Sequence, residues 1–138
     1  WGRPDRAYYP PARAIMRGHP VTLYEGHALA RDFTYIDDVV RAVLAVYDAP
    51  PAKGCCRLLN IGNDRPEPVR HLVELLEHFL QRPAQITLQS RPDADVERTW
   101  ASIEAVRDLT GWCPRTSLAE GVAQFVAWFA AQRGESWG

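Results

Sequence analysis

The sequence has a single lysine, Lys53, among its 16 basic residues, and the other fifteen are arginines. Lysine can shift its pKa and take part in proton transfer, whereas arginine stays charged and suits a planar grip on phosphate or carboxylate. Lysine-dependent chemistry would have to use Lys53, which lies in the polar turn 50–54, a poor place for a catalytic group. A genome bias toward arginine codons explains most of the imbalance, but the sequence still offers no well-placed lysine base.

The nine glycines form no nucleotide-binding loop. Neither G-x-G-x-x-G, G-x-x-G-x-x-G nor a P-loop occurs, so no cradle for a dinucleotide or a triphosphate is visible. The nucleophile elbow G-x-S-x-G is also absent, and the four histidines lack the spacing of a metal site. These absences argue against the common hydrolase and metalloenzyme classes.

Long apolar runs, an excess of one charge and a cysteine framework are missing as well. No run approaches the roughly 20 residues of a membrane span, and no signal-peptide pattern opens the chain, so we expect a cytoplasmic location and no membrane partner. A net charge of -1 gives no case for nucleic acid. Cys55, Cys56 and Cys113 form neither a disulfide framework nor a zinc pattern, and we expect buried or half-buried thiols.

What is present reads as one α/β or α+β domain over residues 1–138, with strands too few for a complete doubly wound sheet. Because Trp1 rather than Met opens the sequence, we expect a piece of a longer chain. The patterns predict helices at about 12–17, 36–48, 69–80 and 102–109 and after 117, and strands at 21–24, 57–62 and 86–88, with brief pairing at 99–100.

Two helix starts carry capping-box patterns. Ser117–Glu120 is a full box, and residues 34–37 have the same form with Asp in the last place. Asp37 and Asp38 then fall in the first helical turn, where we interpret them as capping residues and not as a catalytic pair. The 36–48 helix is expected to bury one apolar face, made by Ile36, Val39, Val40, Val43, Leu44 and Tyr47.

The polar residues that could carry chemistry stand in loops that follow apolar segments. Arg3 lies in the opening loop, Arg31 precedes a helix, Asn60 ends a predicted strand, and Arg91 and Asp95 follow another. Loops held at strand ends are where α/β proteins bind ligands. Arginine suits diphosphate or carboxylate, Asp can accept from ribose hydroxyls, and an aromatic ring such as Tyr24 can pack on a base. From the residues alone, two interpretations stay open: these side chains bind an anionic, hydroxylated ligand, or they are plain surface charges.

Five motifs in order add a family resemblance. The chain resembles the C-terminal portion of the extended short-chain dehydrogenases/reductases, the NAD-dependent epimerase/dehydratases, and is most similar to the UDP-glucuronate 4-epimerases among them. The motifs are Trp1-Gly2-Arg3-Pro4-Asp5, Arg31-Asp32-Phe33-Thr34-Tyr35-Ile36-Asp37-Asp38-Val39, Asn60-Ile61-Gly62-Asn63, Asp95-Val96 with Thr99-Trp100-Ala101, and Gly111-Trp112-Cys113-Pro114 with Leu118-Ala119-Glu120-Gly121.

The resemblance implies a UDP-sugar ligand and a role for each matching residue. Arg31 matches the arginine that binds the diphosphate, and Asn60 matches a second contact on that side. Tyr24 falls where the family places an aromatic ring over the uracil, with the Thr22 backbone nearby. Asp95 matches the carboxylate that holds the ribose.

The remaining matches are looser. Arg3 corresponds to an arginine that pairs with the sugar carboxylate in glucuronate-specific members. The loop 92–96 is one residue longer than the family pattern, which shifts the alignment of Arg91, and the prolines at 10–11 shorten the first helix. Ser102, taken as the cap of the fourth helix, stands where the family often has Asp.

The resemblance also implies the substrate-binding part of an enzyme whose Rossmann half is missing. Family members remove hydride from the sugar C4 to NAD⁺ with a Tyr-x-x-x-Lys pair. Here Ala49, not Tyr, stands four residues before Lys53, so we expect no bound NAD and no catalysis from this chain alone. The alternatives are a non-catalytic binding module and a domain whose ligand binding is lost. A part without its partner sheet would expose an apolar edge and face, so self-association as a dimer or strand-exchanged oligomer is expected.

Overall fold

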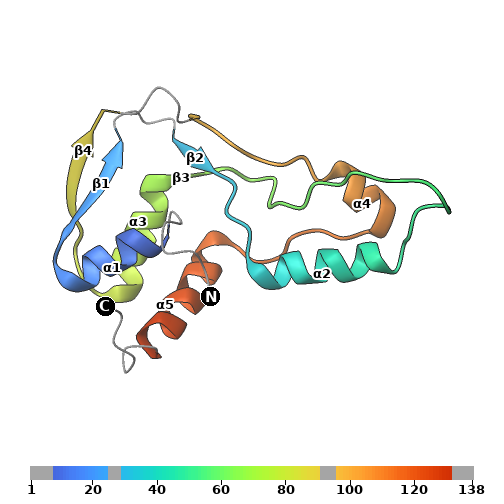
Figure 1. The fold of residues 1–138 in the computed structure, drawn as a ribbon. Helices are drawn as coiled ribbons and strands as arrows, with labels where there is room; N and C mark the ends of the chain where they lie inside the picture. The colour runs from blue at the N-terminus through green and yellow to red at the C-terminus, as the bar shows by residue number, and fades with distance from the viewer. Residues whose placement is uncertain (1–7, 25–28, 91–95, 132–138) are drawn as a thin grey trace.

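The computed structural model describes residues 8–24, 29–90 and 96–131. Its strands form two small sheets: β1 and β4 pair in parallel, and β2 and β3 pair antiparallel (Figure 1). The expected α/β class with about five helices is confirmed for these residues. In chain order the elements are α1 (Tyr9–Arg17), β1 (Pro20–Tyr24), β2 (Ala30–Arg31), α2 (Ile36–Tyr47), β3 (Glu67–Pro68), α3 (Val69–Leu80), β4 (Gln85–Gln89), α4 (Glu104–Thr110) and α5 (Leu118–Ala131).

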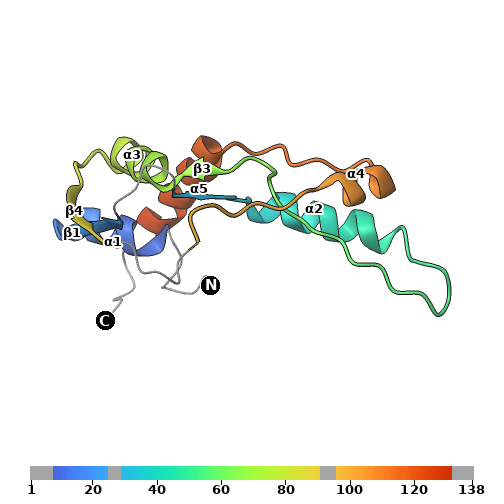
Figure 2. The same cartoon turned by 90° about the horizontal axis from the view of Figure 1, so that it is seen from above.

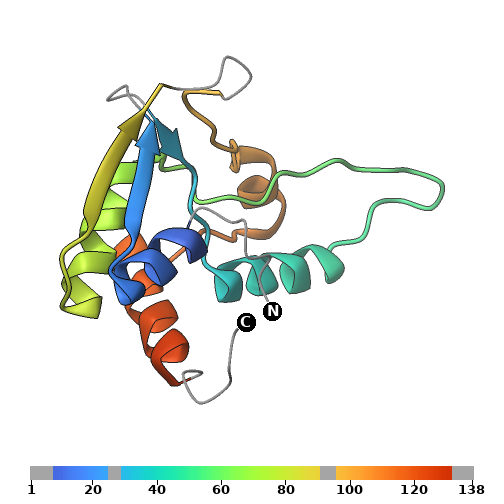
Figure 3. The ribbon, with the colours of Figure 1, turned by 60° about the vertical axis from the view of Figure 1, so that its left-hand side comes forward.

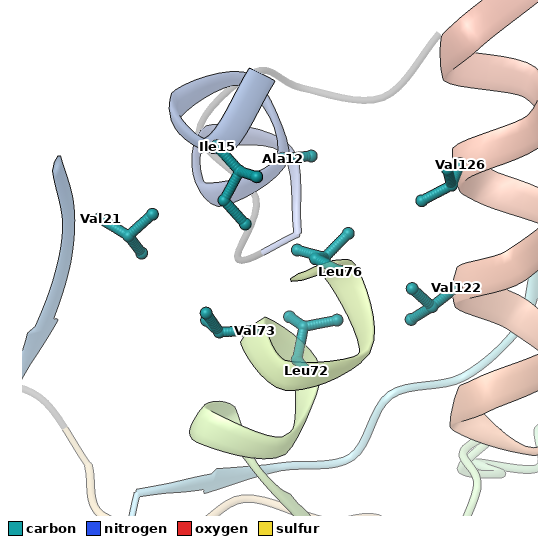
Figure 4. Packing of buried hydrophobic residues seen from close by; sticks show 8 residues of the cluster. All are labelled: Ala12, Ile15, Val21, Leu72, Val73, Leu76, Val122 and Val126. Atoms are coloured by element: carbon teal, nitrogen blue, oxygen red, sulfur yellow. The ribbon is translucent and has the colours of Figure 1, made fainter. Parts of the chain in front are cut away.

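The main core lies where α3 packs between the β1–β4 pair and α5. Leu72, Val73 and Leu76 are at most 1% exposed, because their i, i+1, i+4 spacing places them on one helical face. Figure 4 shows that they meet side chains from α1, β1 and α5. No helix among the described residues is long and apolar enough to cross a membrane, and the cytoplasmic location expected from the sequence stays a prediction.

The capping box predicted at the start of α5 is confirmed. The Ser117 N–H and hydroxyl both donate to Glu120 Oε2 at 2.8 Å, and the Glu120 N–H donates to Ser117 Oγ at 3.2 Å. These bonds satisfy N–H groups that have no partner inside the helix. They fix where α5 begins, and so place its apolar stripe against α3.

A second, smaller cluster joins α2 to α4. Ala42 of α2 packs with Ile103, Val106 and Trp112. The indole N–H of Trp112 is buried and finds no acceptor among the described residues. Gly111, at φ 72° after α4, ends that helix, since glycine adopts the left-handed conformation without a Cβ penalty.

The strand predicted at 57–62 is wrong. Residues 55–60 have no strand partner, and Leu58 is 92% exposed. Figure 2 shows the chain between α2 and β3 reaching past the end of α2 before it returns. An apolar run becomes a buried strand only beside another strand, and the described part of this chain places none there.

The face that α2 buries also differs from the prediction. Asp38 and Ala42 are fully buried, whereas most of the predicted apolar face is open to solvent. We call these exposed residues the α2 stripe: Ile36 (62% exposed), Val40 (48%), Val43 (53%), Leu44 (59%) and Tyr47 (81%). The buried face of α2 is set by Asp38, which binds the segment before α5, and by Ala42, which packs against the residues of α4 and Trp112.

Three local predictions are corrected as well. The box at 34–37 does not form, since Tyr35 is the N-cap of α2 and makes no capping bond. Ser102 does not cap α4, whose N-cap is Ile103. The helix α1 begins at Tyr9 and not at residue 12, because its prolines lie in the first turn, where a missing N–H costs nothing. A fourth correction concerns the cysteines: the expected buried or half-buried thiols are wrong, because all three are exposed in connecting segments.

Candidate functional site

The outer side of β1 carries two of the predicted binding residues. Side chains alternate along a strand, so Val21 and Leu23 pack toward the core while Thr22 and Tyr24 point away from it. Tyr24 is 38% exposed. The strands β1 and β4 run in parallel with ends at the same edge (Figure 3), which is where ligands bind in open α/β sheets.

A cavity of about 470 Å³ opens between α1 and β1, and Thr22 is the predicted site residue among the described ones that lines it. Its polar lining includes Arg13, Arg17 and His19, and its apolar lining includes Pro10. The lining of this basic cavity stops at Thr22 and does not include Tyr24, so the cavity lies toward the start of β1 and not at the edge where the strand ends.

Arg31 lies at a junction of three chain segments. Its backbone pairs with Glu67 in the β2–β3 ladder. Its guanidinium donates to the carbonyl oxygens of Ala30 at 2.9 Å and Glu97 at 3.2 Å. Backbone bonds from Ala30 to Glu97 and from Thr99 to Ala30 hold the same segment. The arginine side chain is thus held against the backbone of residues 30 and 97.

Asp32 adds the segment at residues 63–64 to this junction and also binds the segment that follows Glu97. The Asn63 N–H donates to both carboxylate oxygens at 3.1 Å, and the Asp64 N–H donates to Oδ2 at 3.2 Å. The Ala101 N–H donates to the same Oδ2 at 3.2 Å. One carboxylate therefore holds the loop after Asn60 and the segment after Glu97 against the residue that follows Arg31.

Asn60 is exposed and precedes Gly62 by two residues, about 7 Å along an extended chain. A Cβ on Gly62 would lie 2.6 Å from Asp32 Oδ2 and 2.8 Å from the Ala101 Cβ. No side chain fits at that separation, so the close approach of the three segments requires glycine. The structure brings the chain at Asn60 toward Arg31 and Asp32, while Thr22 and Tyr24 lie on β1.

The other predicted site residues cannot be placed. Arg3, Arg91 and Asp95 lie outside the described residues. Within the described ranges, no group of three or more His, Cys, Asp or Glu could hold a metal ion. Nothing described here contradicts the residue set derived from the sequence, and its roles stay predictions.

A second carboxylate, Asp38, links α2 to the segment before α5. It is fully buried, accepts from the N–H groups of Arg115 at 3.1 Å and Thr116 at 2.9 Å, and pairs with Arg41. Burial raises the pKa of Asp38, but the bonds from Thr116 and Arg115 and the charge of Arg41 outweigh it, so its pKa lies below the ordinary value. The capping role predicted for Asp38 is therefore wrong.

Sequence reasoning missed both carboxylate junctions for one reason. Their partners are backbone N–H groups, and nearly every residue has one, so no pattern of side chains identifies the donors. The available signals were indirect. One was a charged residue, Asp38, among the buried positions of α2, and the other was Gly62, which has no side chain, at the end of an apolar run.

Comparison with known proteins supplies the wider context. Residues 3–62 match the model of the NAD dependent epimerase/dehydratase family. The chain is 38% identical to UDP-glucuronate 4-epimerase 1 of Arabidopsis thaliana over 97% of its length, and 34% identical to a probable UDP-glucuronate 4-epimerase of Rhizobium meliloti over 94%. It spans only 34% and 42% of those two proteins.

Solved structures of similar fold are also covered by this chain over less than half of their length. MoeE5 in complex with UDP-glucuronic acid and NAD matches with a TM-score of 0.84 and 29% identity, over 94% of this chain and 43% of that one. The UDP-glucose 4-epimerase of Thermotoga maritima with UDP-glucose matches with a TM-score of 0.80 and 26% identity, over 93% of this chain and 40% of that one. The chain is therefore similar to the NAD-dependent epimerase/dehydratase family, and it matches a C-terminal part of the family's larger members.

Proposed function

We propose that the chain is the single C-terminal domain that binds the UDP-sugar, UDP-glucuronate in particular, in an NAD-dependent nucleotide-sugar 4-epimerase. The observation that carries the proposal is the junction at Asp32, which holds the segments of Arg31 and Asn60 together. The relatives add support, because MoeE5 was solved with UDP-glucuronic acid and the Thermotoga enzyme with UDP-glucose.

The proposed roles follow the shape of the ligand. Arg31 grips the diphosphate, and because its side chain is already held at the junction, binding costs less conformational entropy. Asn60 contacts the same part of the ligand. Tyr24 covers the uracil, with the Thr22 backbone beside it.

Three further roles fall on residues outside the described ranges. Asp95 accepts from the ribose hydroxyls, Arg3 pairs with the sugar carboxylate, and Arg91 lies in the loop near the nucleotide. Arginine offers a planar fork of donors for a carboxylate, which favours a uronic acid sugar over a neutral one.

The described residues do not fit NAD. NAD supplies hydride acceptance and return at the sugar carbon in the full-length family enzyme. The described glycines serve in other ways: Gly18, Gly54 and Gly111 adopt positive φ values, while Gly62 and Gly121 allow close packing. We therefore assign no hydride step to this chain and propose that it binds substrate without catalysing the reaction alone.

Calorimetric titration with UDP-glucuronate and UDP tests the proposal. We expect binding by the wild-type chain and a loss of about tenfold to a hundredfold in affinity for Arg31→Ala, the effect of removing charge-assisted hydrogen bonds to a phosphate. The control is Arg70→Ala, since Arg70 lies exposed on α3 and only pairs with Glu74 at 3.2 Å. Unchanged affinity in Arg31→Ala contradicts the diphosphate role, and absence of binding contradicts the proposal.

A non-catalytic interaction module is the second candidate, and one observation favours it. The α2 stripe presents five large apolar side chains to solvent, and contiguous apolar patches mark interaction surfaces. The unpaired segment 55–60 lies next to α2 in the chain and is open to pairing. We propose that the isolated chain uses these two features to associate with a second copy.

A further inference from the structure

We propose that Asp32 is a positioning residue of the ligand site: it sets the geometry of Arg31 and Asn60 without touching the ligand. The inference rests on the proposed function, because it concerns the same site. It adds a residue to which no ligand role has been assigned and states what that residue contributes.

The hydrogen bonds of Asp32 favour a positioning role over direct contact. Its two carboxylate oxygens accept from three backbone N–H groups, at 3.1 Å from Asn63, 3.2 Å from Asp64 and 3.2 Å from Ala101. A carboxylate is acceptor-only when ionised, and a negative charge would repel a diphosphate. Asp32 therefore gains its stabilisation from the protein backbone.

The arrangement couples the two predicted diphosphate residues. Arg31 is the direct neighbour of Asp32, and Asn60 precedes the Asn63 donor by three residues. Releasing the loop from Asp32 frees the chain at Asn60 and at the same time loosens the segment whose Glu97 carbonyl accepts from Arg31. Arg31 and Asn60 then no longer keep a fixed distance from each other, which lowers the affinity for the ligand even though each side chain is intact.

Gly62 provides independent support for the same junction. A Cβ there would lie 2.6 Å from Asp32 Oδ2 and 2.8 Å from the Ala101 Cβ, and a distance under 3 Å forces one of the groups to move. Gly62→Ala should therefore displace the loop from Asp32 without altering any polar group. Its effect should reproduce that of Asp32→Asn.

The experiment compares UDP with UMP in the full 138-residue chain. UMP keeps the uracil and ribose but lacks the second phosphate. For Asp32→Asn and Gly62→Ala we expect the affinity for UDP to fall about tenfold, as for one lost charge-assisted bond, and the affinity for UMP to fall far less. The ratio of the two dissociation constants separates lost diphosphate positioning from general destabilisation, which lowers both affinities alike.

The matched control is Asp38→Asn, which also removes a charge that holds two backbone N–H groups, but those belong to the segment before α5. It should lower stability and leave the UDP to UMP ratio unchanged. Amide hydrogen exchange gives a ligand-free readout: in Asp32→Asn the Asn63, Asp64 and Ala101 amides should exchange faster.

The outcomes separate the inference from the proposed function. Suppose that the wild-type chain binds UDP and that both variants keep its ratio of UDP and UMP dissociation constants. The role of Asp32 is then overturned, while the proposed function stands. Unchanged exchange at the three amides overturns the role of Asp32 as well. A wild-type chain that binds neither UDP nor UMP contradicts the proposed function, and the inference falls with it.

Discussion

Asp32 and Asp38 each use one carboxylate to hold backbone N–H groups from distant parts of the chain. Asp32 reaches residues 63, 64 and 101, and Asp38 reaches residues 115 and 116. Hydrogen bonds to a charged acceptor are stronger than neutral ones, at about 1.5–3 kcal/mol each. Single residues thus decide how the loops of this small domain are arranged, at the proposed ligand site in one case and before α5 in the other.

The lowered pKa of Asp38 predicts a specific dependence of stability on pH. Because the folded-state pKa lies below the unfolded value, the contribution of Asp38 is present above about pH 4 and is lost as the pH falls through the folded-state pKa. We expect Asp38→Asn to cost about 1–3 kcal/mol at pH 7 and to reduce the loss of stability on acidification. Urea unfolding between pH 7 and pH 3 measures both. Equal pH slopes in variant and wild type would contradict the assignment.

At the scale of elements, a capping-box pattern predicted the start of a helix in one of two cases. The box at Ser117–Glu120 forms as the pattern states. The box at 34–37 does not, since α2 starts at Ile36 after Tyr35. Tyr35 instead donates its hydroxyl to Gln124 at 2.7 Å and packs on Gly121, so tertiary contacts with α5 fix the start of α2.

The cap of α5 gives a prediction at this scale. Replacing Ser117 by Ala removes the hydroxyl that accepts from the Glu120 N–H, and should lower stability by about 1 kcal/mol and the melting temperature by about 4 °C. Ser102→Ala is the matched control, because Ser102 makes no hydrogen bond in the described structure. Circular dichroism melts check both, and equal midpoints for Ser117→Ala and wild type would count against the capping role.

At the scale of the whole molecule, the packing is uneven. The cluster around α3 draws on α1, β1 and α5, whereas the α2–α4 cluster is small and leaves an indole N–H without an acceptor among the described residues. The α2 stripe lies on this weaker side. An exposed apolar face, as expected from the sequence, is present there, and covering it is favourable.

Self-association follows if a second copy covers that face. We expect the wild-type chain to show a mass above the monomer that rises with concentration in light scattering after size exclusion. Val40→Lys with Leu44→Lys, an exposed i, i+4 pair of the stripe, should shift it toward monomer. Val96→Lys is the control, since Val96 is 56% exposed outside the stripe. A wild-type monomer at all concentrations would rule the proposal out.

The sequence by itself determined the elements whose signals are local. The bounds of α3 match the predicted 69–80, β1 and β4 fall where alternation placed them, and Ser117 caps α5. The helical period, strand alternation and capping bonds act over a few residues, so they can be recognised in the sequence without knowledge of the fold. The motif order also led to the family before any contact was known.

Only the tertiary structure decided the features that depend on distant partners. The run 57–62 had the composition of a strand but no neighbouring strand, and α2 turned its apolar stripe outward because Asp38 and Ala42 are buried on its other side. Asp32 gained its role from N–H groups 31, 32 and 69 residues away. Such contacts depend on which segments meet in space, and short-range sequence patterns carry no record of that.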